Sequence, residues 1–184
     1  MARYVALLRG INVGGKNPIR MAALKACFED HGFTDVTTYI QSGNVVFGAS
    51  RSRDAELTEH IERMLATTFD YDASVVLRSR TQMRSIIERA PEGFGAEPTA
   101  FRYDVLFLKA PLTARAAMQS VPTREGVDSA HAGSGVLYFS RLTSRASQSK
   151  LSRIVSMPIY RSMTIRNWNT TTKLRDLVEA PVGS

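Results

Sequence analysis

The spacing of apolar residues in the first half of the chain predicts alternating strands and helices. Short β-rich runs that end in turn residues are typical of strands, whereas apolar residues spaced three and four positions apart are typical of amphipathic helices. These rules predict strands at Arg3–Arg9, Val36–Ile40, Val45–Phe47 and Val75–Leu77, and helices at Met21–His31, Asp54–Phe69 and Thr81–Ala90. In chain order the elements form the series β-α-β-β-α-β-α.

The same series recurs in the second half of the chain. The predicted strands are Tyr103–Lys109, Gly126–His131, Val136–Ser140 and Met163–Arg166, and the predicted helices are Thr113–Val121, Ser147–Val155 and Asn169–Val178. The first six elements of each half match the split βαβ order of ferredoxin-like domains.

The predicted fold class is therefore α+β, with two similar ferredoxin-like β-α-β-β-α-β-α subdomains. Each subdomain is expected to have a mostly antiparallel sheet with its helices packed on one face. The segment Glu92–Thr99 contains two glycines and a proline and is predicted to link the halves. This linker divides the chain into subdomains at 1–92 and 93–184, which we expect to form one compact unit.

Composition excludes several classes of protein. The longest apolar runs are far shorter than the 18 to 20 residues, roughly, that a membrane span needs, so we expect a cytoplasmic protein without membrane contact. The single cysteine, Cys27, cannot form an internal disulfide, and its place on an apolar helical stripe predicts a core residue rather than a nucleophile. The three histidines have none of the usual metal-ligand spacings, so no metal site is expected. The sequence specifies neither a cofactor nor an oligomeric state.

The net charge of +7 is unevenly distributed along the chain. Residues 1–92 contain 12 basic and 11 acidic residues, whereas residues 93–184 contain 12 basic and 6 acidic residues. No acidic residue occurs between Asp128 and Asp176. Such an excess of positive charge favours an anionic partner, for example a phosphate, a nucleotide, a nucleic acid or an acidic protein. The alternative is a solvated basic face that keeps the protein soluble.

The first predicted strand ends in the glycine-rich loop Gly10–Asn17. Its sequence, GINVGGKN, nearly fits the phosphate-binding pattern GxxxxGK[ST]. Asn17 replaces the hydroxyl residue that holds magnesium, Pro18 disfavours helical geometry at Asn17, and the predicted hairpins do not fit a parallel sheet, so a nucleotide triphosphatase is not expected. The backbone amides of residues 14–16 can still form an anion-binding nest. A tight turn without a ligand is the alternative.

Two further segments carry clustered polar side chains. In the predicted hairpin turn, Gln41, Ser42 and Asn44 can either bind a ligand or satisfy the backbone of the turn itself. The segment Thr164–Lys173 contains the only tryptophan, Trp168, which can stack on a flat ring beside residues able to hold an anion. The alternative for this second segment is a capped helix with a core tryptophan.

Three strings of this sequence carry a family resemblance. LLRGINVGGKN (Leu7–Asn17), YIQSGNVVF (Tyr39–Phe47) and TIRNWNTTTKL (Thr164–Leu174) resemble, in this order, the bacterial family of domain of unknown function 1697. The resemblance implies two similar α+β subdomains and implies no particular activity. The matching residues are Arg9, Asn12, Gly14, Gly15, Lys16, Asn17, Gln41, Ser42, Gly43, Asn44, Arg166, Asn167, Trp168 and Asn169. The chain has Thr171 where the family typically has valine.

These observations lead to one hypothesis about function. We expect the three segments to converge on a groove between the halves that binds an anionic ligand: a nucleotide, a phosphorylated metabolite or single-stranded nucleic acid. The candidate ligand-binding residues are Arg9, Asn12, Gly14, Gly15, Lys16, Asn17, Gln41, Ser42, Asn44, Arg166, Asn167, Trp168, Asn169 and Lys173.

Two alternatives to a pure binding function stay open at this point. No catalytic triad order, nucleophile elbow or HExxH motif occurs in the sequence, so no catalytic residue is assigned. One alternative is a small-molecule transferase or hydrolase that acts on an anionic substrate. The other is a protein-interaction module that uses the basic segment before Asp176.

Overall fold

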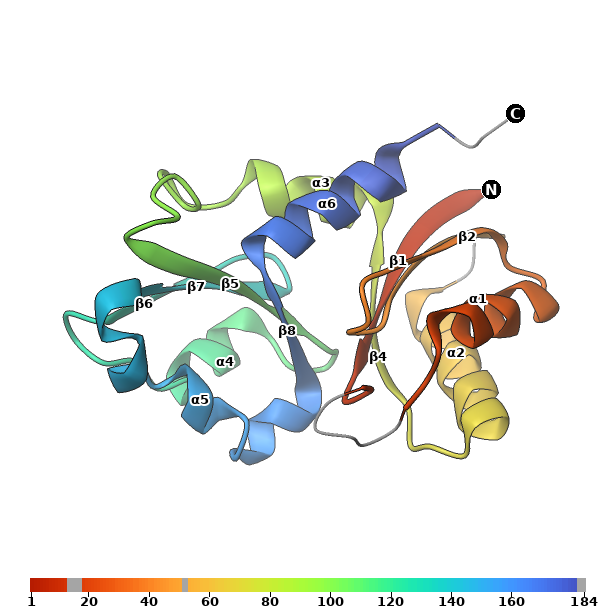
Figure 1. Cartoon of the computed structure of the whole chain (residues 1–184), viewed down its shortest axis with the longest axis horizontal. Helices are drawn as coiled ribbons and strands as arrows, with labels where there is room; N and C mark the ends of the chain where they lie inside the picture. Colours follow the sequence, from red (N-terminus) through yellow and green to blue (C-terminus); the bar gives the residue numbers. More distant parts are fainter. Residues whose placement is uncertain (13–17, 51–52, 182–184) are drawn as a thin grey trace. The chain divides into compact units, whose positions relative to one another are not determined.

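The computed structural model describes residues 1–12, 18–50 and 53–181 of the 184-residue chain (Figure 1). Two compact units are present: unit 1 comprises residues 1–84 together with the end of the chain from residue 173, and unit 2 comprises residues 85–172. Within the described ranges, no helix combines the length and the apolar character needed to cross a bilayer.

Unit 1 is built on a four-stranded antiparallel sheet. Its strands are β1 (Ala2–Arg9), β2 (Thr34–Tyr39), β3 (Asn44–Ala49) and β4 (Ser74–Ser79), and its helices α1 (Met21–Asp30) and α2 (Asp54–Phe69) follow the first and third strands. The strand order β2-β3-β1-β4 is that of a ferredoxin-like sheet, with both central strands paired antiparallel to each other.

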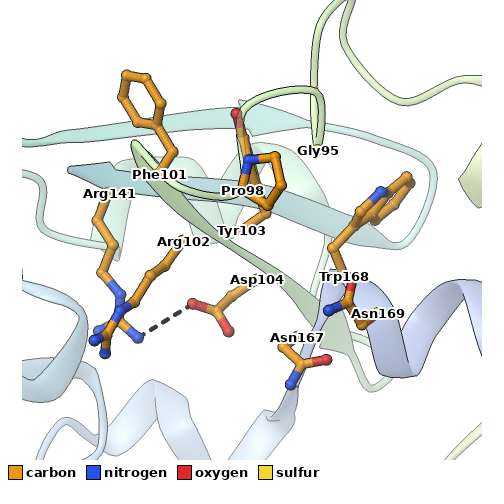
Figure 2. A pocket seen from close by; sticks show the side chains of 10 residues that line it. All are labelled: Gly95, Pro98, Phe101, Arg102, Tyr103, Asp104, Arg141, Asn167, Trp168 and Asn169. Carbon is orange, nitrogen blue, oxygen red and sulfur yellow. Dashed lines mark ion pairs between the residues drawn. The ribbon is translucent and has the colours of Figure 1, made fainter. Parts of the chain in front are cut away.

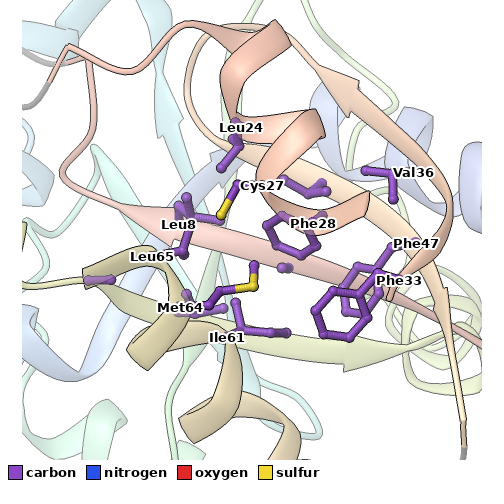
Figure 3. Packing of buried hydrophobic residues seen from close by; sticks show 14 of the residues in the cluster. Leu8, Leu24, Cys27, Phe28, Phe33, Val36, Phe47, Ile61, Met64 and Leu65 are labelled. Atoms are coloured by element: carbon purple, nitrogen blue, oxygen red, sulfur yellow. The ribbon is translucent and has the colours of Figure 1, made fainter. Parts of the chain in front are cut away.

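The core of unit 1 lies between one face of this sheet and the two helices (Figure 3). Leu8 on β1 and Phe47 on β3 point to this face, because alternate strand residues share a face. Phe28 of α1 and Ile61 of α2 pack against them and are fully buried. Cys27 lies in the same cluster, as the sequence predicted, and burial raises the pKa of its thiol.

Unit 2 repeats this plan. Its strands are β5 (Phe101–Leu108), β6 (Asp128–Ala132), β7 (Val136–Leu142) and β8 (Met163–Asn167), in the order β6-β7-β5-β8, and α4 (Ala114–Ser120) follows the first strand. Leu106, Leu137 and Phe139 form one face of the sheet and pack against Ala117 and Ile154. The two sheets confirm the predicted α+β class with two similar subdomains.

A helix follows the fourth strand in each copy: α3 (Arg80–Glu88) after β4 and α6 (Trp168–Glu179) after β8. The boundaries between the two units fall inside these helices. The contacts therefore group the second half of α6 with unit 1. This grouping differs from the division between residues 92 and 93 that the sequence predicts. That division stays a prediction from the sequence.

The predicted helix at Ser147–Val155 is wrong. The segment consists of the 3₁₀-helix η1 (Thr143–Gln148), an extended Ser149 with φ −60° and ψ 145°, and the single turn α5 (Leu151–Ile154). Side chains satisfy the amides at the break: Asp128 accepts from the N–H of Lys150 at 2.9 Å, and Ser149 Oγ accepts from the N–H of Leu151 at 3.2 Å. Because these side chains replace helical carbonyls, the helix cannot continue. A second 3₁₀-helix, η2 (Pro158–Ser162), was not predicted.

Candidate functional site

The first loop and the first hairpin turn meet in unit 1, through the side chain of Asn12. Its amide nitrogen donates to the carbonyls of Ile19 and Gln41, each at 2.9 Å, and its amide oxygen accepts from the N–H of Ile19 at 2.8 Å. The turn approaches the loop closely at Gly43, where a side chain would not fit: a Cβ atom there would lie 2.6 Å from Cδ1 of Ile11. Two of the three family strings are therefore adjacent, and Asn12 holds them together.

The polar side chains of this turn differ in exposure. Asn44 is fully buried, and its amide donates to the carbonyl of Tyr39 at 2.9 Å and to Oγ of Ser42 at 3.0 Å. Gln41 is exposed. Arg9 ends β1, and its carbonyl accepts from the hydroxyl of Tyr71 at 3.2 Å. These bonds show Asn44 stabilising the hairpin, the structural alternative that the sequence had left open.

Four of the predicted ligand-binding residues lie outside the described residues: Gly14, Gly15, Lys16 and Asn17. The proposed anion nest in this loop therefore stays a prediction. The groove between the halves also stays a prediction. Lys173 is exposed in the part of α6 that belongs to unit 1.

Arg166 is buried in unit 2 and bonds within its own strand. Its guanidinium donates to Oγ1 of Thr164 at 2.8 Å and to the carbonyl of Ile165 at 2.9 Å. Burial lowers its pKa to about 10. Arg78 occupies the equivalent position in unit 1: it pairs with Val5, as Arg166 pairs with Val105, and burial lowers its pKa to about 10 as well. Because both copies have an arginine here, buried in unit 2 and partly buried in unit 1, it belongs to the shared fold.

The other three family-matching residues of the third string, Asn167, Trp168 and Asn169, line a pocket in unit 2 (Figure 2). The cavity measures about 340 Å³ and lies where β8 ends and α6 begins. β8 pairs with β5 only from Asp104 onward, so the first residues of β5 extend beyond it along the pocket. The lining residues are Gly95, Pro98, Phe101, Arg102, Tyr103, Asp104, Arg141, Asn167, Trp168 and Asn169.

Two arginines and one aspartate give this pocket its charge. Arg102 and Arg141 are direct cross-strand partners on β5 and β7, so their side chains leave the sheet on the same face. Asp104 follows two residues after Arg102 and therefore shares that face. Its carboxylate lies 3.5 Å from the guanidinium of Arg141. Figure 2 shows both guanidinium groups on the same side of this carboxylate. The lining therefore carries an excess of positive charge.

Asp104 is only 8% exposed, and burial raises the pKa of its carboxyl, although Arg141 and Arg102 lower it in part. Its Oδ2 atom and the Nε atom of Arg141 have no hydrogen-bond partner within the described protein. Oδ1 of Asp128 and Oγ1 of Thr143 are unpartnered too, and Asp128 is the cross-strand partner of Arg141. Buried polar atoms normally have partners, so the two atoms of Asp104 and Arg141 in the pocket lining indicate a place for water or a polar ligand.

The duplication provides an internal comparison for this trio. In unit 1, the register of β1 with β3 and β4 places Tyr4 at the position of Asp104. Each of the two residues pairs with the phenylalanine of the third strand and with the last residue of the fourth strand of its unit. By the same register, Ala2 corresponds to Arg102 and Ala49 to Arg141. The fold therefore accepts apolar residues at all three positions, and the charged trio is specific to the second copy.

Aromatic rings form the opposite end of the pocket. Trp168 packs edge-to-face on Phe94, with ring centroids 5.0 Å apart. Gly95 lets the backbone of its turn pack directly against the indole: its φ is +88°, and a Cβ atom there would lie 2.3 Å from Nε1 of Trp168. Asn167 accepts from the N–H of Thr170 at 2.7 Å and caps α6, whereas the side chain of Asn169 is exposed.

The sequence prediction named Asn167, Trp168 and Asn169, which line this pocket, and did not name Arg102, Asp104 and Arg141. The alternation of residues along the strands could have identified them. Residues 102 and 104 point to the same face of β5 as the buried Leu106 and Leu108, and residue 141 points to the same face of β7 as Leu137 and Phe139. Charged residues at core-facing positions of a strand are rare without a partner, so they indicate a site.

Comparisons with known proteins agree with this fold. The model of the family described as "Protein of unknown function (DUF1697)" matches residues 1–138, which include the first two strings but not the third. The chain is similar to a solved structure of a conserved bacterial protein, SP0830 from Streptococcus pneumoniae, with 28% identity and a TM-score of 0.85. That similarity covers 97% of this chain and 99% of the other. No curated protein sequence matches. Because the family match spans most of its length, the chain belongs to the DUF1697 family.

Proposed function

We propose that the pocket of unit 2 binds a small anionic molecule with a flat ring, such as a nucleotide or a phosphorylated metabolite. The observation that carries this proposal is the cross-strand pair of Arg102 and Arg141, with Asp104 as the single acidic side chain in the lining. Like charges directly opposite each other destabilise a sheet. An anion that contacts both guanidinium groups offsets this repulsion and gains charge-assisted hydrogen bonds.

The aromatic residues support the ring in this proposal. Trp168, Phe101 and Tyr103 line the pocket together with the two arginines. Aromatic side chains provide stacking surface, and the amides of Asn167 and Asn169 can read polar groups at the edge of a ring. The cavity of about 340 Å³ lies at the lower end of the range of about 300–1,000 Å³ that is typical of small-molecule sites. This size favours a mononucleotide over a longer strand.

A thermal-shift screen tests the proposal with matched pairs of compounds. We would compare nucleosides with their monophosphates, and sugars with their sugar phosphates. A phosphorylated compound should raise the melting temperature while its neutral partner does not, because the arginines bind the phosphate. Ligand at 100 times its Kd adds about 2.7 kcal/mol to the free energy of unfolding. If neutral partners shift the melting temperature equally, the anion-binding role of the pocket is wrong.

A second candidate function, an enzyme acting on the same anion, is supported by the position of Asp104. A buried carboxylate with a raised pKa inside a ligand pocket is a candidate proton acceptor. Asp104→Asn should then retain binding of the phosphorylated compound and lose its turnover. Turnover that survives in this variant would remove Asp104 from any catalytic role.

A further inference from the structure

A second group of basic residues lies in unit 2, where Arg124 and Arg145 meet at the neutral side chain of Gln148. Nη2 of Arg145 donates to Oε1 of Gln148 at 3.0 Å, and Nη1 of Arg124 donates to the same oxygen at 3.4 Å. Nη1 of Arg124 also donates to the backbone carbonyl of Gln148 at 3.4 Å. Nη1 of Arg145 donates to the carbonyl of Gly126 at 3.5 Å. Two positive charges therefore share one neutral acceptor.

The nearby acidic groups do not neutralise this pair. No carboxylate oxygen lies within ion-pair distance of Arg124 or Arg145 among the described residues. Oδ2 of Asp128 accepts from the backbone N–H groups of Arg124 and Lys150, each at 2.9 Å, so the nearest carboxylate binds backbone and not the guanidinium groups. Glu125 is exposed in the same turn.

Further cations follow on the same stretch of chain. Lys150 lies two residues after Gln148, and Arg153 is exposed on α5. Counting Glu125 and Asp128 against the four cations leaves an excess of positive charge, and no acidic residue follows until Asp176. Both arginines of the pair are exposed, so this basic group is a surface and not an enclosed pocket.

We propose that this surface, centred on Arg124, Gln148 and Arg145, binds the phosphodiester backbone of a nucleic acid. An exposed surface with several unneutralised cations fits a partner that carries repeated charges, whereas a small anion is bound better by a concave site. Guanidinium groups that converge on one point can take two oxygens of a phosphate in place of the Gln148 amide. This inference is independent of the pocket, because it uses none of the pocket residues.

Fluorescence anisotropy with a labelled oligonucleotide of about 16 nucleotides tests the inference, in single-stranded and in duplex form. The wild-type protein should bind at least one of the two forms, with an affinity that falls as salt concentration rises. Arg124→Gln with Arg145→Gln should bind at least about fivefold more weakly. The slope of log K against log salt should be shallower by about 1.4 on the single strand or about 1.8 on the duplex, since each phosphate contact contributes about 0.7 or about 0.9.

Gln148→Glu provides a variant that keeps both arginines. Its carboxylate replaces the shared oxygen and pairs with both guanidinium groups, so the melting temperature should not fall, while the affinity should drop as in the double variant. The controls remove the same charge elsewhere: Arg80→Gln with Arg89→Gln, at two exposed positions, and Gln119→Glu on α4. These controls should bind within about twofold of the wild type, because they remove no phosphate contact. Equal losses in variants and controls, or no binding of either oligonucleotide form by the wild type, would overturn the inference.

Discussion

Asp104 occupies a position where the corresponding residue of unit 1 is Tyr4, and both side chains are buried. Burying a carboxylate is costly unless it is paired and hydrogen-bonded. Its ion pair with Arg141, at 3.5 Å, is longer than a typical hydrogen bond, and the paired oxygen, Oδ2, has no hydrogen-bond partner in the described protein. The residue therefore stabilises the fold less than the tyrosine of the other copy, and its presence favours a role in binding.

The raised pKa of Asp104 predicts how stability changes with pH. The folded protein holds this proton more tightly than the unfolded chain, so the contribution of Asp104 is greatest below the pKa of an unfolded carboxyl, about 3.9. It decreases as pH rises through the folded pKa. Denaturant unfolding from pH 3.5 to pH 7 should therefore show the wild type losing stability relative to Asp104→Asn. A difference that moves the opposite way would mean that pairing with Arg141 outweighs burial.

Gly95 carries a second prediction at this scale. Gly95→Ala adds a methyl group against Trp168 at a φ of +88°, so the free energy of unfolding should fall by about 2–4 kcal/mol from overpacking and backbone strain together. Gly93→Ala is a matched control, because φ is +75° there but no atom lies within 4 Å of the added carbon. It should cost about 1–2 kcal/mol. Equal losses in the two variants would show that the indole does not constrain this turn.

At the scale of elements, Asn12 connects the loop after β1 with the turn between β2 and β3. Its φ of +53° is a conformation that asparagine tolerates better than most residues. All three of its side-chain hydrogen bonds go to backbone groups. This arrangement gives Asn12 a structural role that needs no ligand.

Asn12→Gly should lower the free energy of unfolding by about 2–3 kcal/mol, because three hydrogen bonds are lost while glycine keeps the positive φ. Asn169→Ala is the control: this side chain is exposed and makes no hydrogen bond within the described residues, so the change should be below about 0.5 kcal/mol. Chemical denaturation of both variants provides the measurement. A loss below about 0.5 kcal/mol for Asn12→Gly would mean that the loop and the turn are held by other contacts.

Two helices show how much of the secondary structure the sequence pattern can predict. The helix at Asp54–Phe69 was predicted with both of its ends correct, because a long apolar stripe with period 3.6 has no competing interpretation. The predicted helix at Ser147–Val155 failed because the carboxylate of Asp128, distant in sequence, takes the N–H of Lys150. Periodicity reports local preference and contains no information about such partners.

At the scale of the whole molecule, the two units share one antiparallel fold but differ in the side chains at three equivalent positions of their sheets. Unit 1 has Ala2, Tyr4 and Ala49 where unit 2 has an arginine, an aspartate and a second arginine. The sequence alone predicted the repeated order of elements, and it named the tryptophan segment, which lines the pocket, as a candidate for ligand binding. Strand alternation marks each residue of the trio as core-facing, but it does not show that the three meet, because cross-strand partners 39 residues apart, such as Arg102 and Arg141, become neighbours only through the strand register.

The most direct test replaces this trio with the residues of unit 1: Arg102→Ala, Asp104→Tyr and Arg141→Ala. The compound with the largest shift in the thermal screen is then titrated calorimetrically into the wild type and into the triple variant. The account predicts that the variant folds with a melting temperature at least as high as that of the wild type, and that it no longer binds the compound. Binding of equal affinity by a folded triple variant would contradict it.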